Sequence, residues 1–222
     1  MTKCRIICLF FWNLTNYDLM KIIYYIIGIF IIIGFVYLYF SNKEPITNYP
    51  SSGVDIIAFG DSLVEGVGAS SGNDFVSILS KNIGRPIVNL GRSGDTTRDG
   101  LLRINQLDNY KPKVVLLLFG GNDHIRKLPI EETQKNLELM IENIQARGAI
   151  VFLLGVRGGL LNDPFDTIFE YLRDKYHTAY LSDLLDGIFG NARYLSDVVH
   201  PNDIGHNMIA ERIYPILIQL LK

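Results

Sequence analysis

The stretch Val-Val-Leu-Leu-Leu-Phe at residues 114–119 decides the fold class, because it is apolar throughout and stops at Gly120-Gly121. A strand that is buried on both faces gives a continuous apolar run of this length, as in parallel sheets covered by helices on both sides. Four further short runs are expected to form strands beside it: residues 54–59 (VDIIAF), 86–90, 150–154 and 179–181.

Apolar residues at helical spacing lie between and after these strands. The expected helices fall near residues 75–83, 97–107, 137–148, 165–176 and 204–221. Alternating strands and helices favour a parallel sheet with helices on both faces. We therefore predict an α/β fold: a three-layer α/β/α sandwich around a parallel five-stranded sheet with flavodoxin-like strand order.

The bulk properties are those of one ordinary globular domain. The chain has 222 residues, a formal net charge of −2 and charged residues of mixed sign. This balance gives no reason to expect nucleic acid as a partner. The two cysteines, Cys4 and Cys8, precede the apolar N-terminal segment. A disulfide framework, a cysteine-based metal site and a cysteine nucleophile are therefore excluded for the globular part.

Residues 22–40 (IIYYIIGIFIIIGFVYLYF) form an apolar segment without a charge. A helix of about 20 apolar residues crosses the hydrocarbon core of a bilayer, and tyrosines near both ends suit the two interfaces. A cleaved signal peptide is the alternative, but its apolar core is usually about 7–15 residues long and is followed by a small-residue cleavage site. The sequence Phe40-Ser41-Asn42-Lys43 offers no such site. We therefore expect an uncleaved transmembrane anchor.

Basic residues indicate the orientation of this anchor. Lys3, Arg5 and Lys21 precede it and Lys43 follows it, so the positive-inside tendency places the N-terminus in the cytoplasm and the main domain in the periplasm or another extracytoplasmic space. Met20 is also a candidate start of translation, since Lys21 would still supply an inside charge. The expected division of the chain is a cytoplasmic segment (1–21), the anchor (22–40), a linker (41–53) and the globular domain (54–222).

Four polar clusters lie at predicted strand ends or before the last helix. They are Gly60-Asp61-Ser62, Ser93-Gly94-Asp95, Gly120-Gly121-Asn122-Asp123 and Asp197-Val198-Val199-His200. Each alone is typical of a turn or a helix cap. In parallel α/β sheets, however, ligands bind beyond the carboxyl ends of the strands. We therefore expect all four clusters to meet at one edge of the sheet.

In these clusters the sequence resembles the SGNH (GDSL) hydrolase family, which is named for a Ser, a Gly, an Asn and a His in successive blocks. The resemblance extends from Val54 to the C-terminus, and it is strongest to the bacterial arylesterase, lysophospholipase and acyl-thioesterase branch. It implies roles for five residues, namely Ser62 as nucleophile, Gly94 and Asn122 as the glycine and asparagine of the middle blocks, His200 as base and Asp197 as its acid. The branch often has Asp-Gly-Ile-His-Pro where this chain has Asp-Val-Val-His-Pro, so only the spacer differs.

The chemistry of these residue types supports the same assignment. A serine hydroxyl is a poor nucleophile until a base removes its proton, and the His200 imidazole can take and return a proton near neutral pH. A turn can place the Asp197 carboxylate, three residues away, against the other ring nitrogen. The backbone N–H groups of Ser62 and Gly94 and the side-chain amide of Asn122 are the expected oxyanion hole.

Other polar residues of the clusters are expected to be structural. Asp61 would brace the turn that carries Ser62, and Asp95 and Asp123 would hold loops through Asx-type bonds. Three further histidines would lie on the surface or in packing contacts: His124, His177 and His206.

Two more interpretations concern ligands. A metal site is conceivable from carboxylate and imidazole groups near the C-terminus, but its spacing matches no zinc signature; its members would be Asp197, His200, Asp203 and His206. Leu160 and Leu161 stand between glycines and a proline. We expect them to line an acyl groove, although a surface loop explains them equally well.

The expected function is hydrolysis of a carboxylic ester or thioester through an acyl-enzyme, without a metal or an organic cofactor. The branch resemblance implies aryl esters, lysophospholipids or acyl thioesters, and a membrane anchor favours a lipid-like substrate. One alternative is a carbohydrate or cell-wall O-acetylesterase. The other is a membrane-anchored binding protein that keeps the fold without turnover, which the intact set of five site residues argues against. The sequence does not indicate an oligomeric state.

Overall fold

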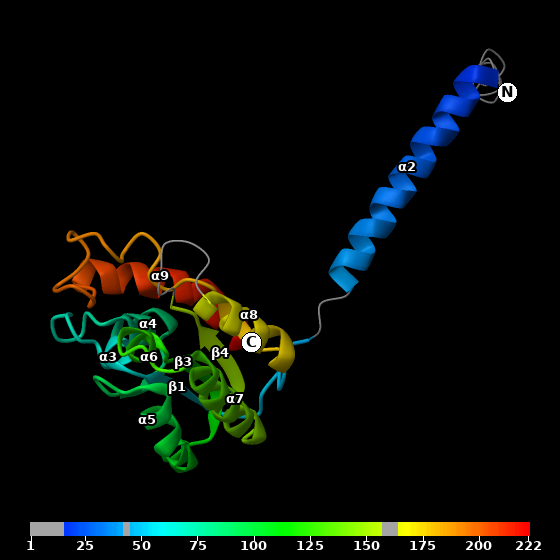
Figure 1. Ribbon diagram of the computed structural model, residues 1–222. Helices are drawn as coiled ribbons and strands as arrows, with labels where there is room; N and C mark the ends of the chain where they lie inside the picture. The colour runs from blue at the N-terminus through cyan, green and yellow to red at the C-terminus, as the bar shows by residue number, and fades with distance from the viewer. Residues whose placement is uncertain (1–15, 42–44, 157–163) are drawn as a thin grey trace. The chain divides into compact units, whose positions relative to one another are not determined.

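The computed structural model describes residues 16–41, 45–156 and 164–222. The chain divides into two units between Glu44 and Pro45. The first unit contains helix α2 (Asn16–Ser41) and the second contains an α/β domain (Figure 1).

Helix α2 is apolar along most of its length. Its stretch Leu19–Val36 has a mean hydropathy of 2.5 and is not buried within the protein. Within the described ranges it is the one helix that is long and apolar enough to cross a membrane. It extends ahead of the expected start at residue 22 and includes Leu19, Met20 and Lys21, which are good helix formers.

Five parallel strands form the centre of the domain, in the order β2-β1-β3-β4-β5. Their bounds are β1 (Asp55–Gly60), β2 (Ile87–Gly91), β3 (Pro112–Leu118), β4 (Ile150–Leu154) and β5 (Ala179–Leu181). This order confirms the expected flavodoxin-like sheet. The direction in which strands are added reverses between β1 and β3, and a crevice forms at such a point. These two strands end side by side, with Gly60 paired with Leu118.

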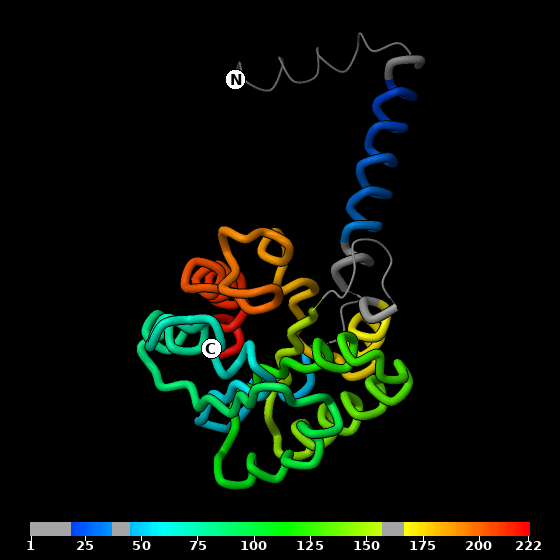
Figure 2. The backbone as a smooth tube through the Cα atoms, turned by 60° about the vertical axis from the view of Figure 1, so that its left-hand side comes forward, coloured from blue at the N-terminus to red at the C-terminus, as the bar shows by residue number. Residues whose placement is uncertain are grey.

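Helices cover both faces of the sheet, as Figure 1 and Figure 2 show. α4 packs with α9 on one face, and α7 packs with α5 and α8 on the other. The described helices of the domain are α3 (Ser62–Glu65), α4 (Phe75–Ile83), α5 (Thr97–Leu102), the 3₁₀ helix η1 (Ile104–Asn109), α6 (Gly121–Ile125), α7 (Ile130–Ala146), α8 (Pro164–Tyr176) and α9 (Asp203–Leu220). The single helix expected over residues 97–107 is divided at Arg103 into α5 and η1.

The strands separate the core into two parts. Ile56 and Leu116 pack toward α4 and α9, whereas Ile57 and Leu117 pack toward α7 and α8. Successive residues of a strand face opposite sides of the sheet. A strand with helices on both sides must therefore be apolar at every position, which explains the run at residues 114–119.

Residues 45–53 bind the amino ends of the strands and belong to the domain. The side chains of Asn48 and Ser51 donate hydrogen bonds to backbone carbonyls just before β4, at 3.0 Å and 2.7 Å. The backbone N–H of Thr47 donates to the carbonyl of His177, just before β5, at 2.9 Å. This part of the expected linker is therefore held by polar contacts, and the chain enters the domain at the amino edge of the sheet.

Candidate active site

The turn after β1 presents Ser62 at the carboxyl edge of the sheet. Asp61 is the N-cap of α3, and its Oδ1 accepts the backbone N–H of Leu63 at 3.0 Å. This contact confirms the interpretation of Asp61 as a brace for the turn. Ser62 begins α3 and is only 8% exposed. Gly60 permits the turn, since a Cβ there would lie 2.5 Å from the carbonyl oxygen of Leu118.

His200 lies beside Ser62 although they are 138 positions apart in the sequence. Ser62 Oγ and His200 Nε2 are 3.0 Å apart, and His200 Nδ1 and Asp197 Oδ2 are 2.7 Å apart. An ionised carboxylate can only accept, so Nδ1 carries the hydrogen and Nε2 is left to accept the serine hydroxyl. A serine in this arrangement can be activated for nucleophilic attack.

Asp197 is held in place by the turn that the sequence predicts. Its Oδ1 accepts the backbone N–H groups of Val199 and His200 at 2.9 Å and 2.8 Å. The hydrogen bond from the His200 side chain, followed by these two backbone bonds, lowers the pKa of Asp197 to about 2. The Asp197 carboxylate is therefore ionised near neutral pH.

The loop after α3 packs against the segment that carries His200. Gly68 is required there, because its φ is 96° and a Cβ would lie 2.3 Å from the carbonyl oxygen of Pro201. Asp203, in the first turn of α9, accepts both the backbone N–H and the hydroxyl of Ser70, at 2.7 Å and 2.6 Å. These contacts join the start of α9 to the Ser62 loop and so bring His200 to the serine.

His206 is buried and has a packing role, as expected. Its Nδ1 accepts the backbone N–H of Phe75 and its Nε2 donates to the carbonyl of Val67, both at 3.3 Å. Burial lowers the pKa of this imidazole and favours its neutral form. Asp203 and His206 thus bind the loop and do not converge with the other members of the alternative metal site. No group of three or more candidate metal ligands comes together among the residues described.

Gly94 and Asn122 reach the same edge from β2 and β3. Gly94 has a φ of 81°, and Asn122 lies in α6. The Asn122 amide donates one hydrogen bond to the carbonyl of Asp95, at 2.9 Å, which leaves its second N–H available. In the part of the chain that the structure describes, the backbone N–H groups of Ser62 and Gly94 have no protein acceptor. All three residues line one pocket, so the structure brings the expected site residues together.

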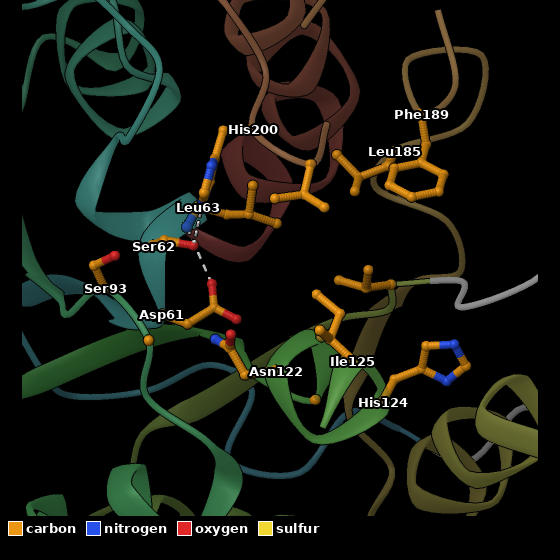
Figure 3. A pocket seen from close by; sticks show the side chains of 15 residues that line it. Asp61, Ser62, Leu63, Ser93, Asn122, His124, Ile125, Leu185, Phe189 and His200 are labelled. Atoms are coloured by element: carbon orange, nitrogen blue, oxygen red, sulfur yellow. Dashed lines mark hydrogen bonds between the residues drawn. The ribbon is translucent and has the colours of Figure 1, made fainter. Parts of the chain in front are cut away.

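This pocket has a volume of about 320 Å³, and Figure 3 shows the side chains around it. Ser62, His200 and Asn122 lie on one side of it. Its other side is apolar and is formed by Ile125, Leu185 and Phe189. Val156 also lines the pocket. Such a pocket, apolar with a few convergent polar groups, suits a small organic ligand. The sequence analysis did not predict the apolar side, because Leu185 and Phe189 lie in a segment of turns between β5 and α9.

Leucines expected in an acyl groove and one of the histidines remain to be placed relative to the pocket. Leu160 and Leu161 lie outside the residues that the structure describes. His124, which we expected on the surface or in packing contacts, lines the pocket.

Asp95 and Asp123 hold loops as expected, but not through local Asx-type bonds. Asp95 Oδ2 accepts Arg103 Nε at 2.6 Å. Asp123 accepts the backbone N–H of Thr97 at 2.9 Å. Both carboxylates are buried, and a buried carboxylate requires donors from neighbouring elements.

Asp61 differs from Asp197 in its surroundings. It lines the pocket and is only 4% exposed. Burial raises its pKa to about 7, and the negative charges of Asp123 and Asp95 act in the same direction. The backbone bond from Leu63 and the charge of His200 act in the opposite direction. The site therefore contains one carboxyl group that ionises easily and one that resists ionisation.

Comparison with known proteins defines the class. The model of the GDSL-like lipase/acylhydrolase family matches residues 58–208. The chain belongs to this family and is an ester-hydrolysing enzyme. The resemblance seen in the four clusters is thereby confirmed.

The chain is also similar to individual proteins in sequence and structure. Esterase TesA of Pseudomonas aeruginosa is 29% identical, over 75% of this chain and 89% of that protein. A crystal structure of TesA matches with a TM-score of 0.72 at 28% identity, covering 76% of this chain and 100% of that one. Thioesterase 1/protease 1/lysophospholipase L1 of Escherichia coli strain K12 is 26% identical, over 70% of this chain and 79% of that protein. An arylesterase of Vibrio mimicus is 30% identical, over 61% of this chain and 71% of that protein.

The raised pKa of Asp61 predicts a pH-dependent stability. A carboxyl group with a pKa of about 7 in the folded protein and 3.8 when exposed stabilises the fold fully below pH 3.8, and this contribution is lost as the pH rises to about 7. Asp61→Asn keeps an N-cap acceptor and cannot ionise. We expect the variant to gain stability relative to wild type between pH 4 and 7, by at most ~4 kcal/mol. Urea unfolding of the full chain in detergent measures the difference.

Asp99→Asn is a control variant, because its stability relative to wild type should change with pH in the opposite direction. Hydrogen bonds from Thr96 lower the pKa of Asp99, so its contribution to stability is present at higher pH and is lost as the pH falls through the folded pKa. This variant should lose stability relative to wild type as the pH rises. A difference between Asp61→Asn and wild type that does not change with pH would contradict the raised pKa.

Proposed function

We propose that the enzyme hydrolyses carboxylic esters or thioesters through an acyl-enzyme on Ser62. The observation that carries this proposal is the 3.0 Å contact between Ser62 Oγ and His200 Nε2, with Asp197 bound to the other ring nitrogen. His200 takes the hydroxyl proton as Oγ attacks the carbonyl carbon. It then returns the proton to the leaving alcohol or thiol as the ester or thioester bond breaks. Water next attacks the acyl-enzyme with His200 again as base, which releases the acid and restores Ser62.

The carbonyl oxygen becomes negative during each attack and needs hydrogen-bond donors. We assign this role to the backbone N–H groups of Ser62 and Gly94 and to the free N–H of the Asn122 amide. Two observations support the assignment: all three residues line the pocket, and both backbone groups lack a protein acceptor in the described part of the chain. Arg126 donates to the carbonyl of Gly94 at 2.7 Å, which restrains the loop that carries this donor.

We propose an acyl chain or aromatic acyl group as the occupant of the apolar side of the pocket. Its volume and lining favour an acyl group longer than acetyl, and thus an aryl ester, an acyl thioester or a lysophospholipid over an O-acetylated glycan. The names of the relatives agree with this class. Leu160 and Leu161 remain proposed contributors to acyl binding.

We also propose that α2 is an uncleaved single-pass anchor and that the catalytic domain lies on the extracytoplasmic side. The length and hydropathy of α2 support the anchor. The basic residues that precede the helix support the orientation.

A fluorophosphonate probe tests the nucleophile. The probe reacts with an activated serine, so we expect labelling of the wild-type chain and none of Ser62→Ala. Ser93→Ala is a matched control, because Ser93 also lines the pocket but does not contact His200. Equal labelling of Ser62→Ala and wild type, or no labelling of folded wild type, would contradict the proposal and favour a binding protein.

The apolar side of the pocket predicts a chain-length preference that depends on Phe189. Phe189 lines the pocket and is 54% exposed, so its replacement should be tolerated by the fold. We expect Phe189→Ala to lower kcat/KM about tenfold for p-nitrophenyl octanoate relative to p-nitrophenyl acetate. The exposed Leu102 is not part of the pocket, and Leu102→Ala should leave the ratio unchanged. An unchanged ratio in Phe189→Ala would exclude this side as the acyl site.

The anchor proposal predicts that the protein stays at full length and bound to membranes in cells. With an epitope tag at the C-terminus, we expect full-length protein that stays with membranes after alkaline carbonate extraction. Ile29→Asp should weaken insertion, since a charged residue at the centre of a membrane helix costs about 2.5–3.5 kcal/mol, whereas Ile29→Leu should not. A soluble product shortened by the length of the N-terminal segment would show a cleaved signal instead.

A further inference from the structure

Arg103 is a buried arginine at the carboxyl edge of the sheet, between α5 and η1. Its side chain is only 11% exposed. Apart from a bond of 3.3 Å to Gln106 Oε1 within η1, its guanidinium donates to three acceptors: the carbonyl of Gly60 at 2.8 Å, the carbonyl of Leu90 at 2.9 Å and Asp95 Oδ2 at 2.6 Å. The expected helix over residues 97–107 is interrupted at the residue that makes these bonds.

These three acceptors lie at the ends of β1 and β2 and in the loop after β2, close to the residues that carry proposed oxyanion donors. Gly60 ends β1, two residues before Ser62, and Leu90 lies near the end of β2. Asp95 directly follows Gly94. One rigid, planar cation therefore connects the end of β1, the end of β2 and the loop after β2.

The third donor is connected to the same group through Asp95. While the Asp95 side chain accepts from Arg103, its backbone carbonyl accepts the Asn122 amide at 2.9 Å. A shift of Asp95 would therefore move the residue next to Gly94 and the hydrogen-bond acceptor of Asn122 together.

Aromatic rings fix the plane of the guanidinium. Its central carbon lies 4.5 Å from the ring centroid of Phe59 and 5.7 Å from that of Phe119, and the two rings meet edge to face. Phe59 and Phe119 precede the loops of Ser62 and Asn122. A lysine could supply the charge but neither the stacking nor the three directed bonds, because its ammonium is a compact point charge.

We propose that Arg103 is a positioning residue that holds the three oxyanion donors in their catalytic arrangement. This inference rests on the proposed function. Arg103 does not line the pocket and contacts neither Ser62 nor His200 through an observed bond. It acts through Gly60 and Asp95, and the paired Asp95 charge compensates its burial.

The proposal predicts a loss of turnover without a loss of substrate binding. A misplacement of about 1 Å at a reacting centre can cost ~10²-fold in rate, so we expect Arg103→Lys to lower kcat about 100-fold. KM should remain close to wild type, because the apolar side of the pocket is unchanged. The pH at which kcat/KM reaches half its maximum should also be unchanged, because the Ser62–His200–Asp197 contacts remain.

A double-mutant cycle with Asn122→Ala separates positioning from a merely structural role. In wild type, removal of this donor should lower kcat ~10²–10³-fold. In the Arg103→Lys background, Asn122→Ala should lower kcat less than tenfold, because the donors are already displaced. The effects of two substitutions on the same group of interacting residues are not additive. A parallel cycle with Phe189→Ala should be additive. Arg92→Lys is the matched control, because Arg92 lies 3.8 Å from the same carboxylate but is 73% exposed; its kcat should match wild type.

All measurements use the full chain in detergent with p-nitrophenyl esters, and thermal unfolding verifies that each variant is folded. If Arg103→Lys does not fold, Asp95→Asn serves in its place, since it keeps the shape of the contact and removes the charge. Additive effects with Asn122→Ala, a raised KM with unchanged kcat, or wild-type kinetics would overturn the proposal. Failure of the proposed function would appear differently, as wild-type protein that neither turns over esters nor reacts with the fluorophosphonate probe.

Discussion

Parallel pairing of β1 with β3 is the constraint on which the rest of the structure depends. Because all five strands run in one direction, each connection returns to the amino edge, and each strand ends at the carboxyl edge. The loops of Ser62, Gly94 and Asn122 follow β1, β2 and β3, so the common direction of the strands brings them to one edge of the sheet. His200 does not follow a strand. It reaches Ser62 only because the start of α9 is bonded to the loop after α3, through Asp203 and His206.

The electrostatics of the site follow from the different surroundings of two aspartates: Asp61, next to Ser62 in the sequence, and Asp197, which contacts His200. Asp197 is half exposed and receives three hydrogen bonds, so it is ionised and orients His200. Asp61 is buried beneath the pocket with one backbone donor, so it is partly neutral near pH 7. A neutral carboxyl group there places less negative charge beside the proposed oxyanion hole than an ionised one would. The surroundings of the two aspartates, rather than their residue type, thus account for their different pKa values.

Much of this structure could be predicted from the sequence, because the signals were local. Continuous apolar runs predicted the strands of a doubly covered sheet. Polar clusters at the strand ends predicted Ser62, Gly94 and Asn122 as site residues, and a cluster before the last helix predicted Asp197 and His200. The apolar side of the pocket could not be predicted, since Leu185 and Phe189 lie in a segment of turns between β5 and α9 and reach the pocket by tertiary packing. Arg103 was also missed, because its partners are backbone carbonyls at Gly60 and Leu90 and leave no pattern in the sequence. The contacts of residues 45–53 could not be predicted for the same reason, as Asn48 and Ser51 bind backbone carbonyls rather than side chains.

The entry of the chain at the amino edge has a consequence for how this enzyme can be attached to a surface. Residues 45–53 are bonded beside the starts of β4 and β5, whereas the pocket opens where the strands end. Whatever precedes Pro45, whether a lipid-embedded helix, a fusion partner or an immobilised bead, is joined at the edge away from the pocket mouth. The fold thereby separates the means of tethering from the path of the substrate, so either can be exchanged during evolution or engineering without redesign of the other.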